Sequence, residues 1–187
     1  MLHRWSIALG VLAGLVVGDL PAPRAQGAAT PAPVLFERHK EVAPIADGTY
    51  TKECGACHFA YQPGWLPERS WRKLLGPEAL AEHFGENAEL DEPTRVKIEA
   101  LLAANAADRS GYKRSKQVMA SLARDAAPLR ITDVPYIRRK HHEIPQRLVN
   151  NDRVKSLSYC DACHPQAAGG NYDDDTVSIP GYGNWTW

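Results

Sequence analysis

The sequence predicts a single, mostly α-helical domain with long loops. The clearest helical pattern covers residues 95–107, where apolar residues recur at approximately helical spacing: Val96, Ile98, Leu101, Leu102 and Ala106. Few segments show the strict apolar and polar alternation that indicates strands. Glycine and proline, with 14 residues each, provide many turn and loop signals between the helical patterns. Together these observations favour a helical fold class.

The other elements follow from local patterns. Helices are expected over 68–75 and 112–125, and Asp91-Glu92-Pro93 is a typical start for the helix over 95–107. Residues 77–85 form a shorter helix-like stretch, in which Leu80, His83 and Phe84 share a face and Gly85 can end the helix. Gly169-Gly170-Asn171 and the proline-containing tail are expected to be loops.

The amino terminus has the pattern of an export signal. Residues 1–4 carry a positive charge, residues 7–18 are an unbroken apolar run, and residues 27–29 are the small residues that a signal peptidase recognises. The apolar run is shorter than the roughly 18 to 20 residues that span a bilayer, so a retained membrane anchor is the weaker interpretation. We therefore expect a secretory signal peptide over residues 1–29, with Ala25 as an alternative cleavage point, and one domain over residues 30–187.

The charge balance excludes a phosphate-tracking surface. The chain has 187 residues, 22 Lys+Arg and 22 Asp+Glu, so its formal net charge is 0 at pH 7. Proteins that bind nucleic acid through its phosphates are strongly basic. The sequence also has no Ser-His-Asp or paired-carboxylate constellation and no glycine-rich phosphate loop. Nucleic-acid binding, hydrolysis and nucleotide chemistry are therefore not indicated.

All four cysteines lie in two copies of one motif. Cys54-Gly55-Ala56-Cys57-His58 and Cys160-Asp161-Ala162-Cys163-His164 both have the form C-x-x-C-H, which attaches c-type haem. We expect a helix through each motif, because positions i, i+3 and i+4 of a helical turn share a face, so two thiols and one imidazole can bind the same porphyrin. The thiols form thioethers, and the histidine becomes the proximal iron ligand. The sequence therefore predicts two covalently attached c-type haems, held by Cys54, Cys57 and His58 and by Cys160, Cys163 and His164.

Other uses of four cysteines explain this pattern less well. An exported protein often pairs its cysteines as disulfides, but disulfides do not require this spacing. Zinc sites usually place their two pairs about 12 to 20 residues apart, whereas Cys57 and Cys160 are about 100 positions apart. Neither zinc nor a thioredoxin-like dithiol explains a histidine after both pairs.

Each iron needs a second axial ligand unless it binds a gas or a substrate. The remaining histidines of the expected domain are His39, His83, His141 and His142. His83 is favoured as a ligand because it lies on an apolar face only 25 positions after His58. His141 and His142 point about 100° apart on a helix, so one is expected to face an iron and the other to face solvent.

The remaining candidates are weaker. His39 lies in charged sequence near the amino terminus, and Met119 fits the core of a helix. The basic run Arg138-Arg139-Lys140 is expected to be a solvated surface, with contact to haem propionates or to an acidic partner as the alternative. Asp173-Asp174-Asp175 is expected to be a solvated loop rather than a calcium site.

From about Glu53 to Pro180, the sequence resembles the bacterial dihaem cytochromes c of the DHC type. The stretches containing His83 and Arg130 are the more specific parts. The resemblance is carried by Glu53 to His58 with Tyr61 and Pro63, Leu66-Pro67, Ser70-Trp71, His83-Phe84-Gly85-Glu86-Asn87-Ala88, Arg130-Ile131-Thr132, Arg139-Lys140-His141, Val154-Lys155-Ser156 and the second haem motif.

The resemblance implies a single-domain dihaem cytochrome c, mostly α with long loops and built around two covalent haems. It also implies histidine ligation of both irons, by His58 with His83 and by His164 with His141. A periplasmic role follows, in which a membrane b-type cytochrome supplies electrons and a small oxygen-binding monohaem cytochrome c accepts them.

These features favour an electron carrier over an enzyme. Two histidines saturate an iron, so outer-sphere electron transfer remains, and histidine in place of methionine favours low potentials. The rival is a haem enzyme or gas sensor of peroxidase-like kind with an open or labile iron, against which the surplus of histidines counts. A scaffold with structural haems explains less. Since porphyrins would supply much of the buried surface, we expect the haem-free chain to fold poorly.

Overall fold

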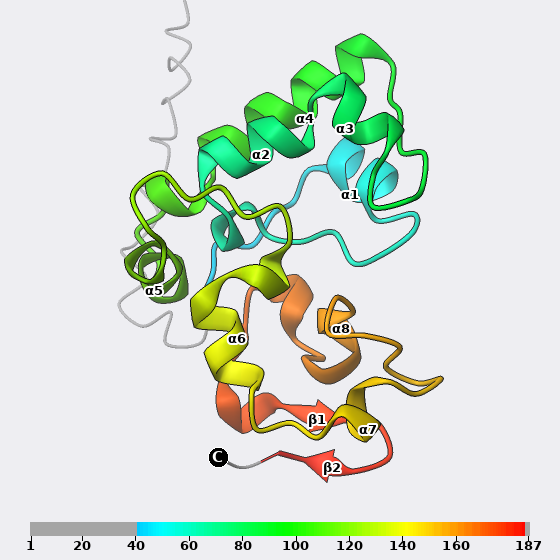
Figure 1. Ribbon diagram of the computed structural model, residues 1–187, viewed down its shortest axis with the longest axis vertical. Helices are drawn as coiled ribbons and strands as arrows, with labels where there is room; N and C mark the ends of the chain where they lie inside the picture. The colour runs from blue at the N-terminus through cyan, green and yellow to red at the C-terminus, as the bar shows by residue number, and fades with distance from the viewer. Residues whose placement is uncertain (1–40, 186–187) are drawn as a thin grey trace, which may run out of the picture. The chain divides into compact units, whose positions relative to one another are not determined.

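The computed structural model describes residues 41–185, in which helices are the main regular structure (Figure 1). The expected signal peptide over 1–29 and His39 lie outside the described residues. The α-helices are α1 (Gly48–Cys54), α2 (Glu68–Leu74), α3 (Pro77–Ala81), α4 (Glu92–Ala104), α5 (Lys113–Ser121), α6 (Pro135–His141), α7 (Gln146–Val149) and α8 (Cys160–Cys163). Short 3-10 helices η1 (Pro63–Trp65), η2 (Ala107–Arg109), η3 (Ile131–Asp133), η4 (Ala167–Gly169) and η5 (Asp174–Thr176) lie between them. The predicted helical class is confirmed.

Helix α4 is the longest helix of the described part, as its sequence pattern predicts. Asp91 caps its start by accepting a hydrogen bond from the Thr94 backbone N–H. Ile98 and Leu102 are fully buried, whereas Val96 is exposed, so the buried stripe is narrower than the sequence pattern. The helix ends at Ala104, before the expected residue 107, because the Ala107 N–H bonds the Leu66 carbonyl instead of continuing the helix.

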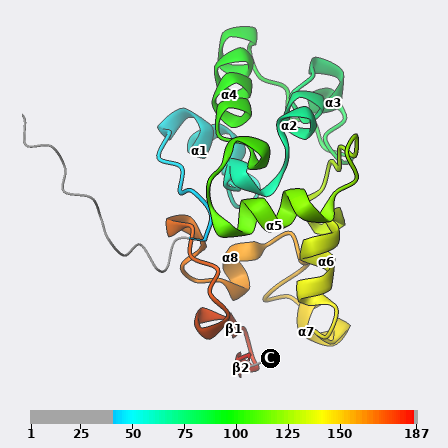
Figure 2. The same ribbon diagram turned by 90° about the vertical axis from the view of Figure 1, so that its left-hand side faces the viewer.

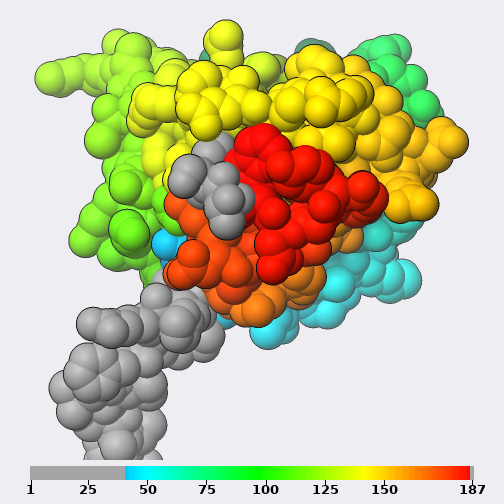
Figure 3. Space-filling view, turned by 90° about the horizontal axis from the view of Figure 1, so that it is seen from below, coloured from blue at the N-terminus to red at the C-terminus, as the bar shows by residue number. Residues whose placement is uncertain are grey.

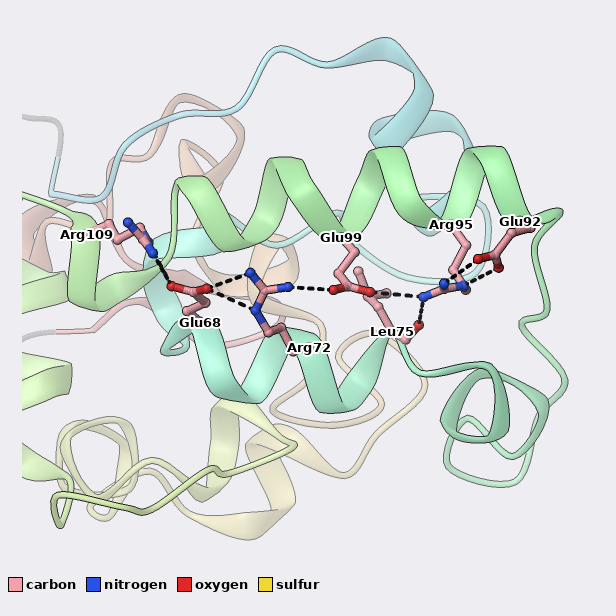
Figure 4. Close-up of polar contacts among 7 residues, drawn as sticks. All are labelled: Glu68, Arg72, Leu75, Glu92, Arg95, Glu99 and Arg109. Carbon is pink, nitrogen blue, oxygen red and sulfur yellow. Dashed lines mark hydrogen bonds and ion pairs between the residues drawn. The ribbon is translucent and has the colours of Figure 1, made fainter.

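Helices α2 and α4 pack against each other (Figures 1 and 2). Their facing apolar side chains include Trp71 and Leu102, and the Trp71 indole N–H donates to the Pro63 carbonyl at 2.8 Å. An unbroken chain of ion pairs also joins the two helices (Figure 4). It runs through Arg109, Glu68, Arg72, Glu99, Arg95 and Glu92 with separations of 2.5 to 3.0 Å.

Helix α5 crosses close to the 3-10 helix η1. At Gly64 a Cβ atom would lie 2.5 Å from the Ser115 hydroxyl and 2.8 Å from a methyl group of Val42. Only glycine allows this approach. Val118 and Ser115 of α5 are fully buried, and Met119 packs on the core from a partly buried position, as the sequence predicts for a helix residue.

The carboxyl-terminal part forms a small hairpin. Strands β1 (Ser178–Ile179) and β2 (Gly183–Asn184) pair antiparallel, with Ser178 opposite Asn184. The turn of the hairpin lies close to Arg153, and Figure 3 shows these late residues in red beside the yellow residues of α6 and α7. The scarcity of strands agrees with the sequence.

Two helix predictions near the motifs are wrong. Only the second motif is helical, as α8; the first passes from the last residue of α1, Cys54, into a turn. The chain folds back here so closely that a Cβ at Gly55 would lie 2.2 Å from the Thr51 carbonyl oxygen. Helix α3 ends at Ala81, before His83. None of the helices within residues 41–185 is long and apolar enough to cross a membrane.

Candidate haem sites

His58 and His83 face each other beside the first motif. Their ring centroids are 6.3 Å apart and their planes are inclined by 20°. His58 follows the turn after α1, and its Nδ1 lies 2.7 Å from the Phe59 carbonyl oxygen. The ring of Tyr61 stacks on His58 at 4.8 Å. We call the region around this pair the first site.

A tight turn, rather than a helix, positions His83. The backbones of His83 and Glu86 exchange two hydrogen bonds, of 2.8 and 3.2 Å, across Phe84 and Gly85. Both intervening residues have positive φ, 57° and 100°. Turns with two positive φ angles suit glycine or asparagine, so phenylalanine is unusual there. The expectation that Leu80, His83 and Phe84 share a helical face is therefore wrong, although His83 still reaches the site.

Arg130 covers this turn from another part of the chain. Its guanidinium lies 3.9 Å from the centroid of the Phe84 ring, which is the geometry of a cation–π contact. The two stretches that make the family resemblance most specific thus meet in space. Burial, the nearby His58 and the Arg130 charge together lower the pKa of His83, which favours the neutral imidazole that binds metals.

The first site opens into a large cavity. Its empty space, including the open mouth, is about 2080 Å³, and Cys54, Cys57, His58 and His83 lie on its walls. The apolar walls include Leu66, Trp71, Leu74, Leu80 and Leu102. The two thiols of the first motif and two imidazoles therefore border a single, mainly apolar space, which Cys160 of the second motif also reaches.

His141 and His164 form the second facing pair. Their ring centroids are 6.2 Å apart, but here the planes are inclined by 73°. His141 ends α6, and its Nδ1 lies 2.8 Å from the Ile137 carbonyl oxygen. His164 follows α8 and has the Tyr172 ring at 5.1 Å. We call the region around this pair the second site.

His142 does not belong to this pair. Its side chain is exposed, its Nδ1 lies 2.7 Å from the Arg139 carbonyl oxygen, and its Nε2 is 3.7 Å from Glu143. It lines neither cavity. Of the two neighbours that the sequence leaves open, the fold brings His141 to His164 and turns His142 toward solvent.

The second site is a smaller cavity. Its empty space, including the open mouth, is about 950 Å³, and Cys160, Cys163, His164 and His141 line it together with buried aromatic rings: Trp65, Tyr136 and Tyr172. Burial, with a smaller contribution from His141, lowers the pKa of His164 to about 4, and burial also lowers the pKa of His141. Both imidazoles are therefore neutral near pH 7.

Charged residues that the sequence assigns to the surface lie at this site. Lys140 binds Asp174 at 2.8 Å, and Arg114 lies 3.5 Å from the same carboxylate. Arg114 is buried, where it donates to Glu41 at 2.7 Å and to the Tyr136 hydroxyl. The expectation of a fully solvated Asp173-Asp174-Asp175 loop is thus wrong for Asp174. No sequence pattern indicates a role for Arg114, which lies in a charged run of α5.

The two sites have a common wall. Residues on both cavities are Ile131, Thr132, Ser156, Leu157, Tyr159 and Cys160. Tyr61 joins His58 to the chain beside this wall, because its ring stacks on His58 while its hydroxyl donates to the Ser158 carbonyl at 2.6 Å, next to Tyr159. The buried Gln62 beside it donates to the Ala167 carbonyl and accepts from the hydroxyl of Tyr172. No sequence pattern indicates the role of Gln62 or Tyr172.

The donor set fits haem better than the other uses of cysteine. Two metal–nitrogen bonds of about 2 Å, with about 1 Å from each nitrogen to its ring centroid, bring facing imidazoles to about 6 Å, as in both pairs. All four cysteines are unpaired, and burial raises the pKa of Cys54 to about 11 and of Cys160 to about 12. Redox dithiols need lowered thiol pKa values. Within residues 41–185, no three His, Cys, Asp or Glu side chains cluster as a metal site.

Known proteins resemble the chain in sequence and in fold. A sequence profile of the family described as dihaem cytochrome c matches residues 50–172. A dihaem cytochrome c from Rhodobacter sphaeroides is 41% identical, with a TM-score of 0.62, over 70% of this chain and 100% of that chain. The X-ray structure of a dihaem cytochrome type c from Shewanella baltica OS155 is 38% identical, with a TM-score of 0.60, over 74% of this chain and 97% of that chain.

No curated protein sequence matches the chain. The profile nevertheless spans most of the described residues, and the solved structures match it over almost their whole length. The chain therefore belongs to the dihaem cytochrome c family and carries two covalently attached c-type haems.

Proposed function

We propose that the protein is a periplasmic electron carrier in which two histidines bind each haem iron. His58 and His83 bind the iron of the haem held by Cys54 and Cys57. His164 and His141 bind the iron of the haem held by Cys160 and Cys163. The supporting observation is that each cavity has one C-x-x-C-H histidine facing a second histidine at the separation that one metal between them requires.

Ligation by two histidines supports electron transfer over catalysis. A bound haem supplies one-electron reduction and oxidation of its iron. Histidines on both sides leave no coordination position for a substrate. The peroxidase-like alternative needs an open or labile iron, and a second histidine faces each proximal one. Histidine in place of methionine also favours the oxidised state, so the proposal includes low potentials.

The proposed location and partners come from the sequence. The signal pattern over residues 1–29 supports export. The family resemblance supports a membrane b-type cytochrome as electron donor and a small oxygen-binding monohaem cytochrome c as acceptor. Mixing the reduced protein with such an acceptor under anaerobic conditions tests the second partner: rapid oxidation of the dihaem protein supports it, and no reaction rejects it.

Carbon monoxide binding tests the ligation. We expect the visible spectrum of the reduced, haem-loaded protein to be unchanged by carbon monoxide, since both irons are six-coordinate. His83→Ala and His141→Ala are each expected to keep both covalent haems but to bind carbon monoxide at one iron. A shifted Soret band in the unaltered protein would favour the peroxidase-like alternative.

His142→Ala is the matched control for the second site. It removes the neighbouring imidazole, which faces solvent and Glu143. The variant is expected to keep the low-spin spectrum and to bind no carbon monoxide. If only His142→Ala opened an iron, His142 and not His141 would be the ligand.

A further inference from the structure

The two sites have walls of opposite net charge. The cavity of the first site has three acids on its wall, Glu53, Glu86 and Glu89, and one base, Arg130. The cavity of the second site has two bases, Arg114 and Lys140, and one acid, Asp174. Glu41 binds Arg114 from outside the cavity and is itself approached by Lys113 at 3.8 Å.

The surrounding surface repeats this asymmetry. Residues 78–92, which hold His83, contain six acids and no lysine or arginine. Residues 138–155, which hold His141, contain six bases and two acids. Helix α3 and its following loop lie at one end of the described unit, and α6 and α7 lie at the other (Figures 1 and 2).

The two walls also differ in their contact with water. Exposed side chains on the wall of the first site are Cys57, Phe84, Glu86, Asn87, Glu89, Leu129, Arg130 and Leu157. On the wall of the second site, Leu157 is the only exposed residue within the described part of the chain. The second site is therefore the drier environment.

Both differences act in the same direction on a bound haem. Oxidised iron carries one more positive charge than reduced iron. Acidic neighbours stabilise this charge, whereas basic neighbours and removal of water destabilise it. The chain therefore favours oxidised iron at the first site and reduced iron at the second.

We infer that the half-reduced protein holds its single electron at the second site, between His141 and His164. The inference rests on the ligation in the proposed function, and it adds the order in which the two haem irons are reduced. The first electron from a one-electron reductant reduces the iron at the second site. No proton is taken up and no bond forms or breaks. The reduced site then lies at the basic end of the described unit, beside α6 and α7.

The different ring inclinations allow each iron to be observed separately. Low-spin ferric iron between nearly parallel imidazoles gives a rhombic electron paramagnetic resonance signal. Nearly perpendicular imidazoles give a strongly anisotropic signal. The angles of 20° and 73° therefore assign the rhombic signal to the first site and the anisotropic signal to the second.

Stepwise reduction of the haem-loaded protein with dithionite tests the inference. The anisotropic signal is expected to disappear first, while the rhombic signal persists until more reductant is added. Loss of the rhombic signal first would overturn the inference alone. A high-spin ferric signal in the resting protein would overturn the proposed ligation, and the inference with it.

Charge neutralisation tests the cause. The double variant Glu86→Gln/Glu89→Gln removes two acids from the wall of the first site and keeps the size of the side chains. It is expected to raise the potential at which the rhombic signal disappears and to leave the anisotropic signal unchanged. Asp125→Asn is the control, because Asp125 is exposed and lines neither cavity. Equal shifts in the double variant and the control would reject the assigned cause.

Discussion

Gly85 and Phe84 determine where His83 lies at the first site. A φ of 100° at Gly85 is open to glycine, whereas residues with a Cβ atom adopt it at a cost of about 1 to 2 kcal/mol. Phe84 has the same kind of backbone without the freedom of glycine, and its contact with Arg130 offsets part of that strain. The position of the His83 imidazole thus depends on its two neighbours in the turn.

We predict that Gly85→Ala destabilises the protein by about 1 to 2 kcal/mol and makes the position of the His83 side chain less fixed. Chemical denaturation measures the first effect, and carbon monoxide binding at the first iron measures the second. Gly111→Ala is the matched control: a Cβ meets no atom within 4 Å at either glycine, but Gly111 has no positive φ. Similar losses in both variants would contradict the role of the backbone.

Helices α2 and α4 are joined by charge as well as by apolar packing. Glu68 is central, because one oxygen accepts from Arg72 at 2.8 Å and the other accepts from Arg109. These hydrogen bonds lower the pKa of Glu68 below its ordinary value of 4.5. A carboxyl with a lowered folded-state pKa contributes stability above its unfolded pKa and loses it as pH falls through the folded value.

We predict that Glu68→Gln lowers the urea midpoint at neutral pH, and that the difference from the unaltered protein shrinks once the pH falls below 4.5. Added salt should also reduce the difference at neutral pH, since Arg72 and Arg109 are exposed. Urea denaturation of both proteins across pH provides the measurement. Glu78→Gln on α3 is the control, and a pH-independent deficit in Glu68→Gln would show that charge is not the cause.

The elements predicted from sequence are the ones whose signals are local. The capping residue of α4 and the spacing of both C-x-x-C-H motifs lie within a few positions of what they specify. The helix expected through His83 failed because α3 ends at Ala81 and the next residues form a turn that a positive φ at phenylalanine makes hard to foresee. Local periodicity could not detect the contact with Arg130, 46 positions after Phe84.

Part of the candidate sites could not be predicted from local sequence patterns. His58 and His164 are specified by their motifs, and His83 and His141 by the need for second ligands together with the family resemblance. Tyr172 and Arg114 reach the second site through the tertiary fold, from 8 positions after His164 and from 27 positions before His141. Their contacts are set by packing, for which one sequence carries no periodic signal.

The whole described unit is built around space for its cofactors. Two cavities, with about 2080 and 950 Å³ of empty space including their open mouths, lie among helices that are mostly shorter than ten residues. Isolated helices of this length are unstable in water, so most of their stability comes from burying apolar faces. Much of the surface available for that burial borders the haem sites.

We predict that the chain without haem folds poorly. Replacing the four motif cysteines by serine should reduce the helical circular dichroism signal and remove the cooperative thermal transition. A variant with serine at Cys160 and Cys163 alone keeps the first attachment motif. Its helical circular dichroism signal should lie between those of the haem-loaded protein and the variant without the four cysteines. A haem-free protein with the melting curve of the loaded one would show that the polypeptide packs without its cofactors.

The contacts of Gln62 bear on the order in which the early and late parts of the chain pack together. Its side chain is buried beside residues of η1, yet two of its partners, Ala167 and Tyr172, are 105 and 110 positions later. A growing chain presents its early residues long before those partners exist, and closing so long a loop is slow. Until then Gln62 has only its local partner, the Trp65 indole N–H. We therefore expect the packing of the first third of the polypeptide to be completed only when the last third is present.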